Sequence, residues 1–189
     1  MFMRGFERFL APHGYEMRIT KFALFQNIYR STDGEMLDLE RGRELFNSFF
    51  EKDVEDIDPA PEARDVLAGI AQKATVVILT NAPKHGRAPR TRWLNKNGFP
   101  YPLVINVGPK GPAVALLAAR TGGRVAFVDD LLPNLESVAT EAPRVRRFQH
   151  VADERLRPYA PTDLERHPRF DDWPALGRAI TEALGLGKG

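Results

Sequence analysis

The stretch Val125-Ala-Phe-Val-Asp-Asp130 is an apolar run that ends on two adjacent carboxylates and then enters a segment with helical spacing. An unbroken apolar run of this kind is typical of a strand buried in a parallel sheet. In open α/β sheets, ligands bind in the crevice at the carboxyl ends of the strands. The stretch therefore predicts an α/β fold with its chemistry at Asp129 and Asp130.

Two neighbouring carboxylates repel each other unless a cation lies between them. Magnesium is a hard cation that commonly binds carboxylate oxygens at the end of a strand. The alternative is that one of the two acids caps the following helix, because Asp is a preferred N-cap residue. The stretch alone leaves both interpretations open.

Apolar runs and helical patterns alternate on both sides of this strand. We expect further strands at 75–80, 103–106 and 145–150, and helices at 62–72, 88–96, 112–122, 131–140 and 173–184. Such alternation favours a Rossmann-like parallel sheet with helices on both faces. Residues 1–58 instead show Phe and Leu at helical spacing, which predicts three helices and a separate α-helical domain at 1–58, before an α/β core at 59–189.

Composition narrows the possible functions. The 189 residues include 27 Lys and Arg against 25 Asp and Glu, and this net charge of +2 indicates no general attraction to nucleic acid or to an anionic membrane. The sequence has no cysteine, which excludes disulfides and thiolate metal sites. No apolar run approaches the roughly 20 residues that span a bilayer. We therefore expect a cytoplasmic protein.

Three other residues at strand ends carry groups suited to phosphate chemistry. Thr80 and Asn81 close the strand at 75–80, and Lys110 lies in a Gly-Pro-Lys-Gly-Pro loop just before a helix. A hydroxyl, an amide and an ammonium group can hold phosphate oxygens and balance their charge. Taken singly, each also has a plainer interpretation as a turn residue or a solvated lysine.

In order and placement these segments resemble the motifs of the haloacid dehalogenase-like hydrolase superfamily. Thr80 ends Val-Val-Ile-Leu-Thr, Lys110 precedes a helix, and Asp129 and Asp130 end an apolar strand, with Asn134 in the trailing position. The resemblance implies a Rossmann-like core with a small α-helical cap. It also implies a magnesium-dependent phosphatase that acts on small phosphorylated metabolites.

The resemblance also implies roles for the residues. Thr80 would hold a phosphoryl oxygen, with Asn81 beside the substrate, and Lys110 would balance charge. Asp130 would bind Mg²⁺, and Asp129 would lie beside the metal or bind it through water.

The sequence departs from the family in one respect. The family's first motif is an Asp-x-Asp pair at the end of an opening strand, and it supplies the nucleophile and the acid/base; no apolar strand here ends in that pair. The family places that strand between those ending at Thr80 and Asp130, so the resemblance implies a missing central strand. We expect translation of the natural protein to start further upstream.

Two other functions remain open. The absent nucleophile supports a catalytically inactive member of the family that binds a ligand or regulates a partner. A receiver-like signalling domain also has paired acids and a lysine, but here Lys110 precedes the acids instead of following them.

Overall fold

The computed structural model describes residues 2–52, 55 and 57–187, and it is a mixed α/β structure with short parallel strands. The chain forms two compact units. Unit 1 consists of Met1–Ala60, Ala82–Pro100 and Asp153–Ala160, and unit 2 consists of Pro61–Asn81, Tyr101–Ala152 and Pro161–Gly189. Among the described residues, no helix is long and apolar enough to cross a membrane.

Unit 1 is built around a cluster of phenylalanine rings. Its helices are α1 (Phe2–Leu10), α2 (Leu39–Lys52) and α4 (Arg87–Lys96). The rings come from α1 and α2, and they are Phe2, Phe6, Phe9, Phe46, Phe49 and Phe50. Their helical spacing in the sequence correctly predicted both helices. The α4 helix, which the sequence pattern assigned to the α/β core, groups with unit 1.

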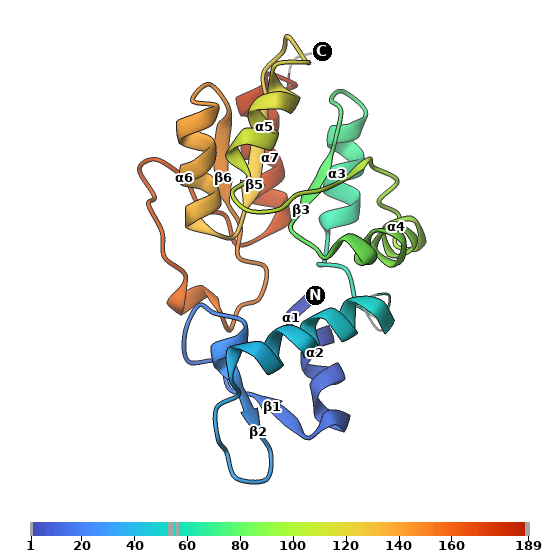
Figure 1. Cartoon of the computed structure of the whole chain (residues 1–189). Coiled ribbons are helices and arrows are strands. Elements are labelled where there is room, and N and C mark those ends of the chain that lie inside the picture. Colours follow the sequence, from blue (N-terminus) through green and yellow to red (C-terminus); the bar gives the residue numbers. More distant parts are fainter. Residues whose placement is uncertain (1, 53–54, 56, 188–189) are drawn as a thin grey trace. The chain divides into compact units, whose positions relative to one another are not determined.

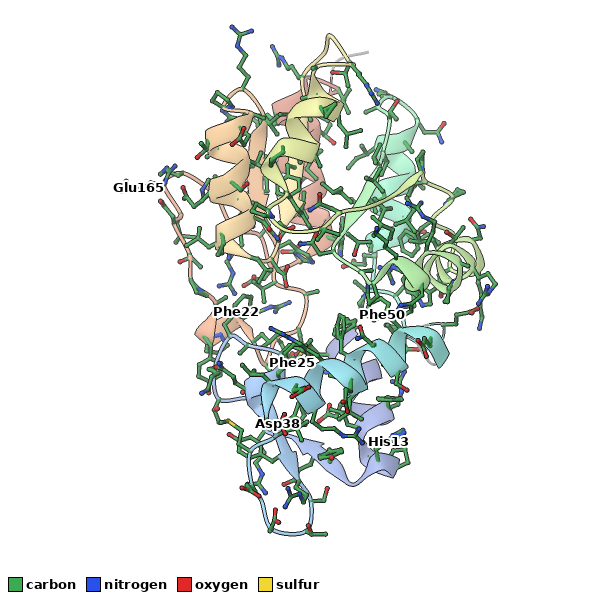
Figure 2. All side chains as sticks on the ribbon, in the orientation of Figure 1. His13, Phe22, Phe25, Asp38, Phe50 and Glu165 are labelled. Atoms are coloured by element: carbon green, nitrogen blue, oxygen red, sulfur yellow. The ribbon has the colours of Figure 1, made fainter. Side chains whose placement is uncertain are left out.

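The middle helix predicted for residues 1–58 was wrong. The segment forms an antiparallel pair of strands, β1 (Tyr15–Met17) and β2 (Ile28–Arg30), with a short 3-10 turn before β2. Phe25, in that turn, packs edge-on against Phe46 of α2 with the ring centroids 5.8 Å apart (Figure 2). The apolar residues therefore reach the core of unit 1 without forming a helix.

The buried side chain of Asn27 explains this local structure. Its Nδ2 atom donates to the carbonyl oxygens of Lys21 at 2.9 Å and Ala23 at 2.6 Å, and its Oδ1 atom accepts from the Thr20 amide at 3.0 Å. Asparagine side chains compete in this way with the backbone hydrogen bonds of a helix. Asn27 therefore stabilises a loop where apolar spacing alone predicts a helix.

Unit 2 contains the elements predicted for the α/β core except α4, with strands shorter than expected (Figure 1). In chain order they are α3 (Ala63–Ala71), β3 (Ile78–Thr80), β4 (Leu103–Ile105), α5 (Gly111–Ala118), β5 (Ala126–Asp129), α6 (Leu132–Glu141), β6 (Arg146–Gln149) and α7 (Trp173–Leu184). The region between β6 and α7 is irregular, as its prolines predict.

The strands of unit 2 form two parallel pairs, where the sequence pattern predicted one sheet. β3 pairs with β4, and β5 pairs with β6. Within the described part of the chain, no ladder of hydrogen bonds joins β3 to β5.

Helices cover the strand pairs through two apolar clusters. The first contains Phe127 of β5 with residues of α5 and α6, and Leu79 of β3 packs against it. The second contains Phe148 of β6 with residues of α3 and α7, and Ala126 and Val128 of β5 pack against it. Alternate residues of β5 thus face opposite clusters, which explains why its sequence is apolar throughout.

Candidate functional site

A buried ion pair lies at the carboxyl end of β5. The Nζ atom of Lys110, in the residue just before α5, is 2.6 Å from Oδ2 of Asp129, the last residue of β5. The Lys110 side chain is 13% exposed and the Asp129 side chain 2% exposed. A charge-assisted hydrogen bond in such surroundings is stronger than the same bond in water. The pair therefore fixes the loop after β4 against the end of β5.

The second carboxylate oxygen of Asp129 is also satisfied. Oδ1 accepts from Nδ2 of Asn134 at 2.9 Å and from the backbone amide of Leu131 at 2.9 Å. Leu131 is the N-cap residue of α6 and no side chain among the described residues caps this helix, so the helix-capping interpretation of the two acids is wrong. Asn134 is itself buried and holds the carboxylate from the first turn of α6.

Asp130 differs from its neighbour. Burial and the adjacent Asp129 carboxylate together raise the pKa of Asp130 to about 6, although the residue is exposed at the surface. Its backbone carbonyl accepts from Nε2 of the fully buried Gln149 at 3.0 Å. The main chain at the strand end is therefore fixed, while the Asp130 carboxylate stays accessible. A nearby cation would stabilise the charged form of this carboxylate.

Thr80 and Asn81 lie at the end of β3, where Asn81 organises the loop that carries Lys110. Its Nδ2 atom donates to the carbonyl of Gly108 at 2.9 Å, and its Oδ1 atom accepts from Nδ2 of Asn106 at 2.8 Å. No hydrogen bond or ion pair joins Thr80 or Asn81 directly to the two aspartates in the described structure. The structure thus unites Lys110, Asp129 and Asn134 through direct bonds, and it connects Asn81 to them through the Asn106–Lys110 loop.

Two polar residues that support the site were missed in the sequence. Asn106 stabilises the loop before Lys110 by donating to the carbonyl of Gly108 at 3.0 Å. Ser137 of α6 accepts from the amide of Gly111, the first residue of α5, at 3.0 Å. The position of Asn106 at the end of an apolar run, like that of Asn81, was the available signal. Ser137 gives none, because its role depends on how α5 and α6 pack.

Gly111 is required where α5 approaches α6. A Cβ atom at this position would lie 2.3 Å from the carbonyl oxygen of Ser137. Only glycine allows the backbones to approach this closely. The close packing of α5 on α6 places Lys110, just before α5, where its side chain bonds to Asp129.

The site offers some, but not all, of the oxygen ligands that a magnesium ion requires. Among the described residues, no group of three or more His, Asp or Glu side chains is placed to hold a metal. The oxygens of Asp129 already accept three hydrogen bonds, which leaves Asp130 as the accessible carboxylate. Magnesium commonly keeps several waters and binds proteins through one or two carboxylates. The site therefore suits a hydrated ion bound directly by Asp130 and only indirectly by Asp129.

Comparison of the sequence with models of protein families finds no match, and comparison with curated proteins finds none.

Proposed function

We propose that unit 2 is the core of a haloacid dehalogenase-like hydrolase, a magnesium-dependent phosphatase of small phosphorylated metabolites. The observation that carries the proposal is the buried Lys110–Asp129 pair, with Nζ 2.6 Å from Oδ2, and the exposed Asp130 next in the chain. A fixed cation beside an accessible carboxylate suits a substrate that brings both a phosphate and its metal ion.

Each residue has a role in this proposal. Asp130 holds Mg²⁺, which when bound neutralises phosphate charge. Lys110 adds a second positive charge and is held in place by Asp129. The Thr80 hydroxyl donates to a phosphoryl oxygen, and Asn81 keeps the loop of Lys110 in position.

Hydrolysis also needs a nucleophile. Asp129 is engaged by Lys110 and Asn134, and Asp130 is assigned to the metal, so neither is available to attack phosphorus. The family resemblance assigns this role to an Asp-x-Asp strand that residues 1–189 do not supply. Translating the DNA upstream of the first codon tests this: the absence of an in-frame apolar strand ending in Asp-x-Asp would refute the proposal in this form.

Metal binding and catalysis are tested separately. We expect Mg²⁺ to bind the 189-residue chain in calorimetry and Asp130→Asn to weaken binding at least tenfold. Asp65→Asn is the matched control, since Asp65 is an exposed carboxylate of α3 paired with Arg64. If the upstream DNA encodes an in-frame Asp-x-Asp strand, the chain extended by that segment is then assayed for Mg²⁺-dependent hydrolysis of p-nitrophenyl phosphate. Equal Mg²⁺ affinity in the Asp130→Asn and unmodified chains would contradict the metal assignment.

The second candidate function is a catalytically inactive protein of the same fold that binds a ligand or regulates a partner. It is favoured by the lack of a cluster of three metal-ligating side chains among the described residues. Magnesium-dependent hydrolysis by the extended chain, abolished by Asp130→Asn, would exclude this alternative.

A further inference from the structure

Arg90 of unit 1 is a half-buried cation that stacks on an aromatic ring. It lies in α4, and its Cζ atom is 4.4 Å from the ring centroid of Trp93, one turn further along the helix. The Trp93 ring stacks on Phe99 with the centroids 5.7 Å apart, and its Nε1 atom donates to the carbonyl of Ile57 at 2.6 Å. The ring beneath the guanidinium group is therefore held in place by contacts of its own.

Arg90 has no carboxylate partner in the described part of the chain, where its guanidinium group makes no hydrogen bond or ion pair. The nearby acids are engaged elsewhere, since Glu55 pairs with Arg92 at 2.6 Å and Glu51 lies 3.7 Å from His85. Burial lowers the pKa of Arg90 to about 10, and no charged neighbour among the described residues opposes this effect. Because burying a charge without a partner is unfavourable, the position of Arg90 favours an anion from outside the chain.

A comparison with Arg18 shows what Arg90 lacks. Arg18 also lies over a ring, with its Cζ atom 5.0 Å from the centroid of Tyr29, but its guanidinium group pairs with Glu16. The Arg18 side chain is 52% exposed, so water also stabilises its charge. Arg90 is less exposed and has only the ring. A guanidinium group has five N–H donors, and stacking on a ring leaves its edge available to an acceptor.

The sequence around Arg90 favours a doubly charged anion. Residues 84–96 contain five Lys and Arg and no Asp or Glu. The exposed Arg87 lies three residues before Arg90, and residues at this spacing are neighbours on a helix surface. A phosphate group carries up to about two negative charges and three acceptor oxygens, whereas a carboxylate carries one charge. The guanidinium group also matches phosphate oxygens in pairs.

We propose that Arg90, with Arg87 one turn before it, binds a phosphate group of a ligand from outside the chain. The Trp93 ring fixes the plane of the Arg90 guanidinium group, whose N–H groups donate to two phosphate oxygens. All residues of this site belong to unit 1, and none of them takes part in the candidate site of unit 2. The proposal therefore goes beyond the phosphatase function and does not require it.

The test follows the fluorescence of Trp93 in the full 189-residue chain. The sequence has two tryptophans, so Trp173→Phe leaves Trp93 as the only one. Titration of this variant with inorganic phosphate at constant ionic strength should change the emission of Trp93 saturably. Adding Arg90→Met keeps an apolar side chain against the ring but removes the guanidinium group, so the affinity for phosphate should fall at least tenfold.

The matched control is Arg18→Met, the same substitution at an arginine that stacks on a ring and has its own carboxylate. This variant should keep the phosphate affinity of the parent chain. Equal affinity in the Arg90→Met and parent chains, or no change in emission with phosphate, would overturn the proposal. Acetate that binds as tightly as phosphate would overturn the assignment of a phosphate group.

A second variant separates binding from folding. Arg90→Lys keeps the positive charge but loses the planar pair of donors, so we expect an unchanged circular dichroism spectrum and an affinity for phosphate lower by about threefold or more. Unchanged affinity in this variant would contradict the role of the guanidinium group. Phosphate binding at Trp93 reports on the site in unit 1, whereas Mg²⁺ binding by Asp130 reports on the phosphatase site, so each can fail independently.

Discussion

The Nζ atom of Lys110 lies 2.6 Å from Oδ2 of Asp129, and this bond connects the loop after β4 to the end of β5. Both side chains are largely removed from solvent, and burying a charge is energetically unfavourable. Each of the two charges offsets this cost for the other. The residues on which the proposed chemistry depends are thus also part of what holds unit 2 together.

Replacing Lys110 with methionine should therefore destabilise unit 2. The Lys110→Met variant leaves the Asp129 carboxylate buried beside an apolar group, which should lower the free energy of unfolding by about 3 kcal/mol. Urea denaturation followed by circular dichroism measures this. The control is Lys73→Met, since Lys73 is exposed and its Nζ atom donates to the backbone carbonyl of Leu186. A loss similar to that of the control would mean that the ion pair contributes little.

The close approach of α5 and α6 gives a second prediction. In Gly111→Ala the added methyl group would meet the Ser137 carbonyl at 2.3 Å, so the helices must separate and stability should fall by about 1 to 3 kcal/mol. Gly69→Ala is the matched control, because a Cβ atom there meets nothing within 4 Å and alanine favours a helix. The midpoint of thermal unfolding should be lower for Gly111→Ala and higher for Gly69→Ala than for the unmodified protein. Equal midpoints in the two variants would contradict the close approach of α5 and α6.

The hydrogen bonds of Asn27 predict the stability of unit 1. Asn27→Ala removes the donors to the carbonyls of Lys21 and Ala23, which should cost about 1 to 3 kcal/mol. Asn47→Ala on the exposed face of α2 should have little effect. The measurement is urea unfolding monitored by near-ultraviolet circular dichroism of the aromatic cluster. Equal losses in the two variants would argue that Asn27 does not determine the loop.

Glu136 predicts a dependence of stability on pH. The fully buried His167 side chain, with Nε2 2.8 Å from Oε1 of Glu136, lowers the pKa of Glu136, and Arg166 lowers it further. A carboxyl group whose pKa is lower in the folded state stabilises the protein above its unfolded pKa, and this contribution is lost as the pH falls through the folded pKa. The unfolding free energy of Glu136→Gln should therefore fall less between pH 7 and pH 3.

Urea denaturation at steps of half a pH unit measures how steeply the free energy of unfolding changes with pH. Glu141→Gln, an exposed position at the end of the same helix, is the control and should keep the slope of the unmodified protein. Identical slopes in the Glu136→Gln and unmodified proteins would show that this carboxyl group does not contribute.

Periodicity identified most elements of the fold but not their pairing. The apolar runs ending at Thr80 and Asp129 were recognisable as strands because burial on both faces demands apolar residues throughout. Whether the strands join into one sheet depends on backbone bonds between distant segments, which local patterns do not encode. The segment before Ile28 was misassigned for a related reason, since a single buried side chain, Asn27, outweighs helical spacing.

The candidate site was predictable to a similar degree. Asp129 was identified from its position at a strand end, Lys110 from its loop before a helix and Asn134 from its spacing after Asp130. The structure joins the three by direct bonds. The supporting role of Ser137 was not predictable, because it depends on the depth at which α5 meets α6. Position at the end of a strand or the start of a helix thus locates candidate groups. The packing of α5 against α6 decides which of these groups bond to one another.

The contact between α3 and α7 has a consequence for biosynthesis. The α3 helix begins at Ala63, but α7, with Leu176 and Ile180 in the cluster that covers α3, begins only at Trp173. During translation α3 lacks this partner while about a hundred further residues are made, which at typical elongation rates takes roughly 5 to 20 s. The cluster that contains Ile70, Leu176 and Ile180 can therefore be completed only after α7 has left the ribosome, late in the synthesis of the chain.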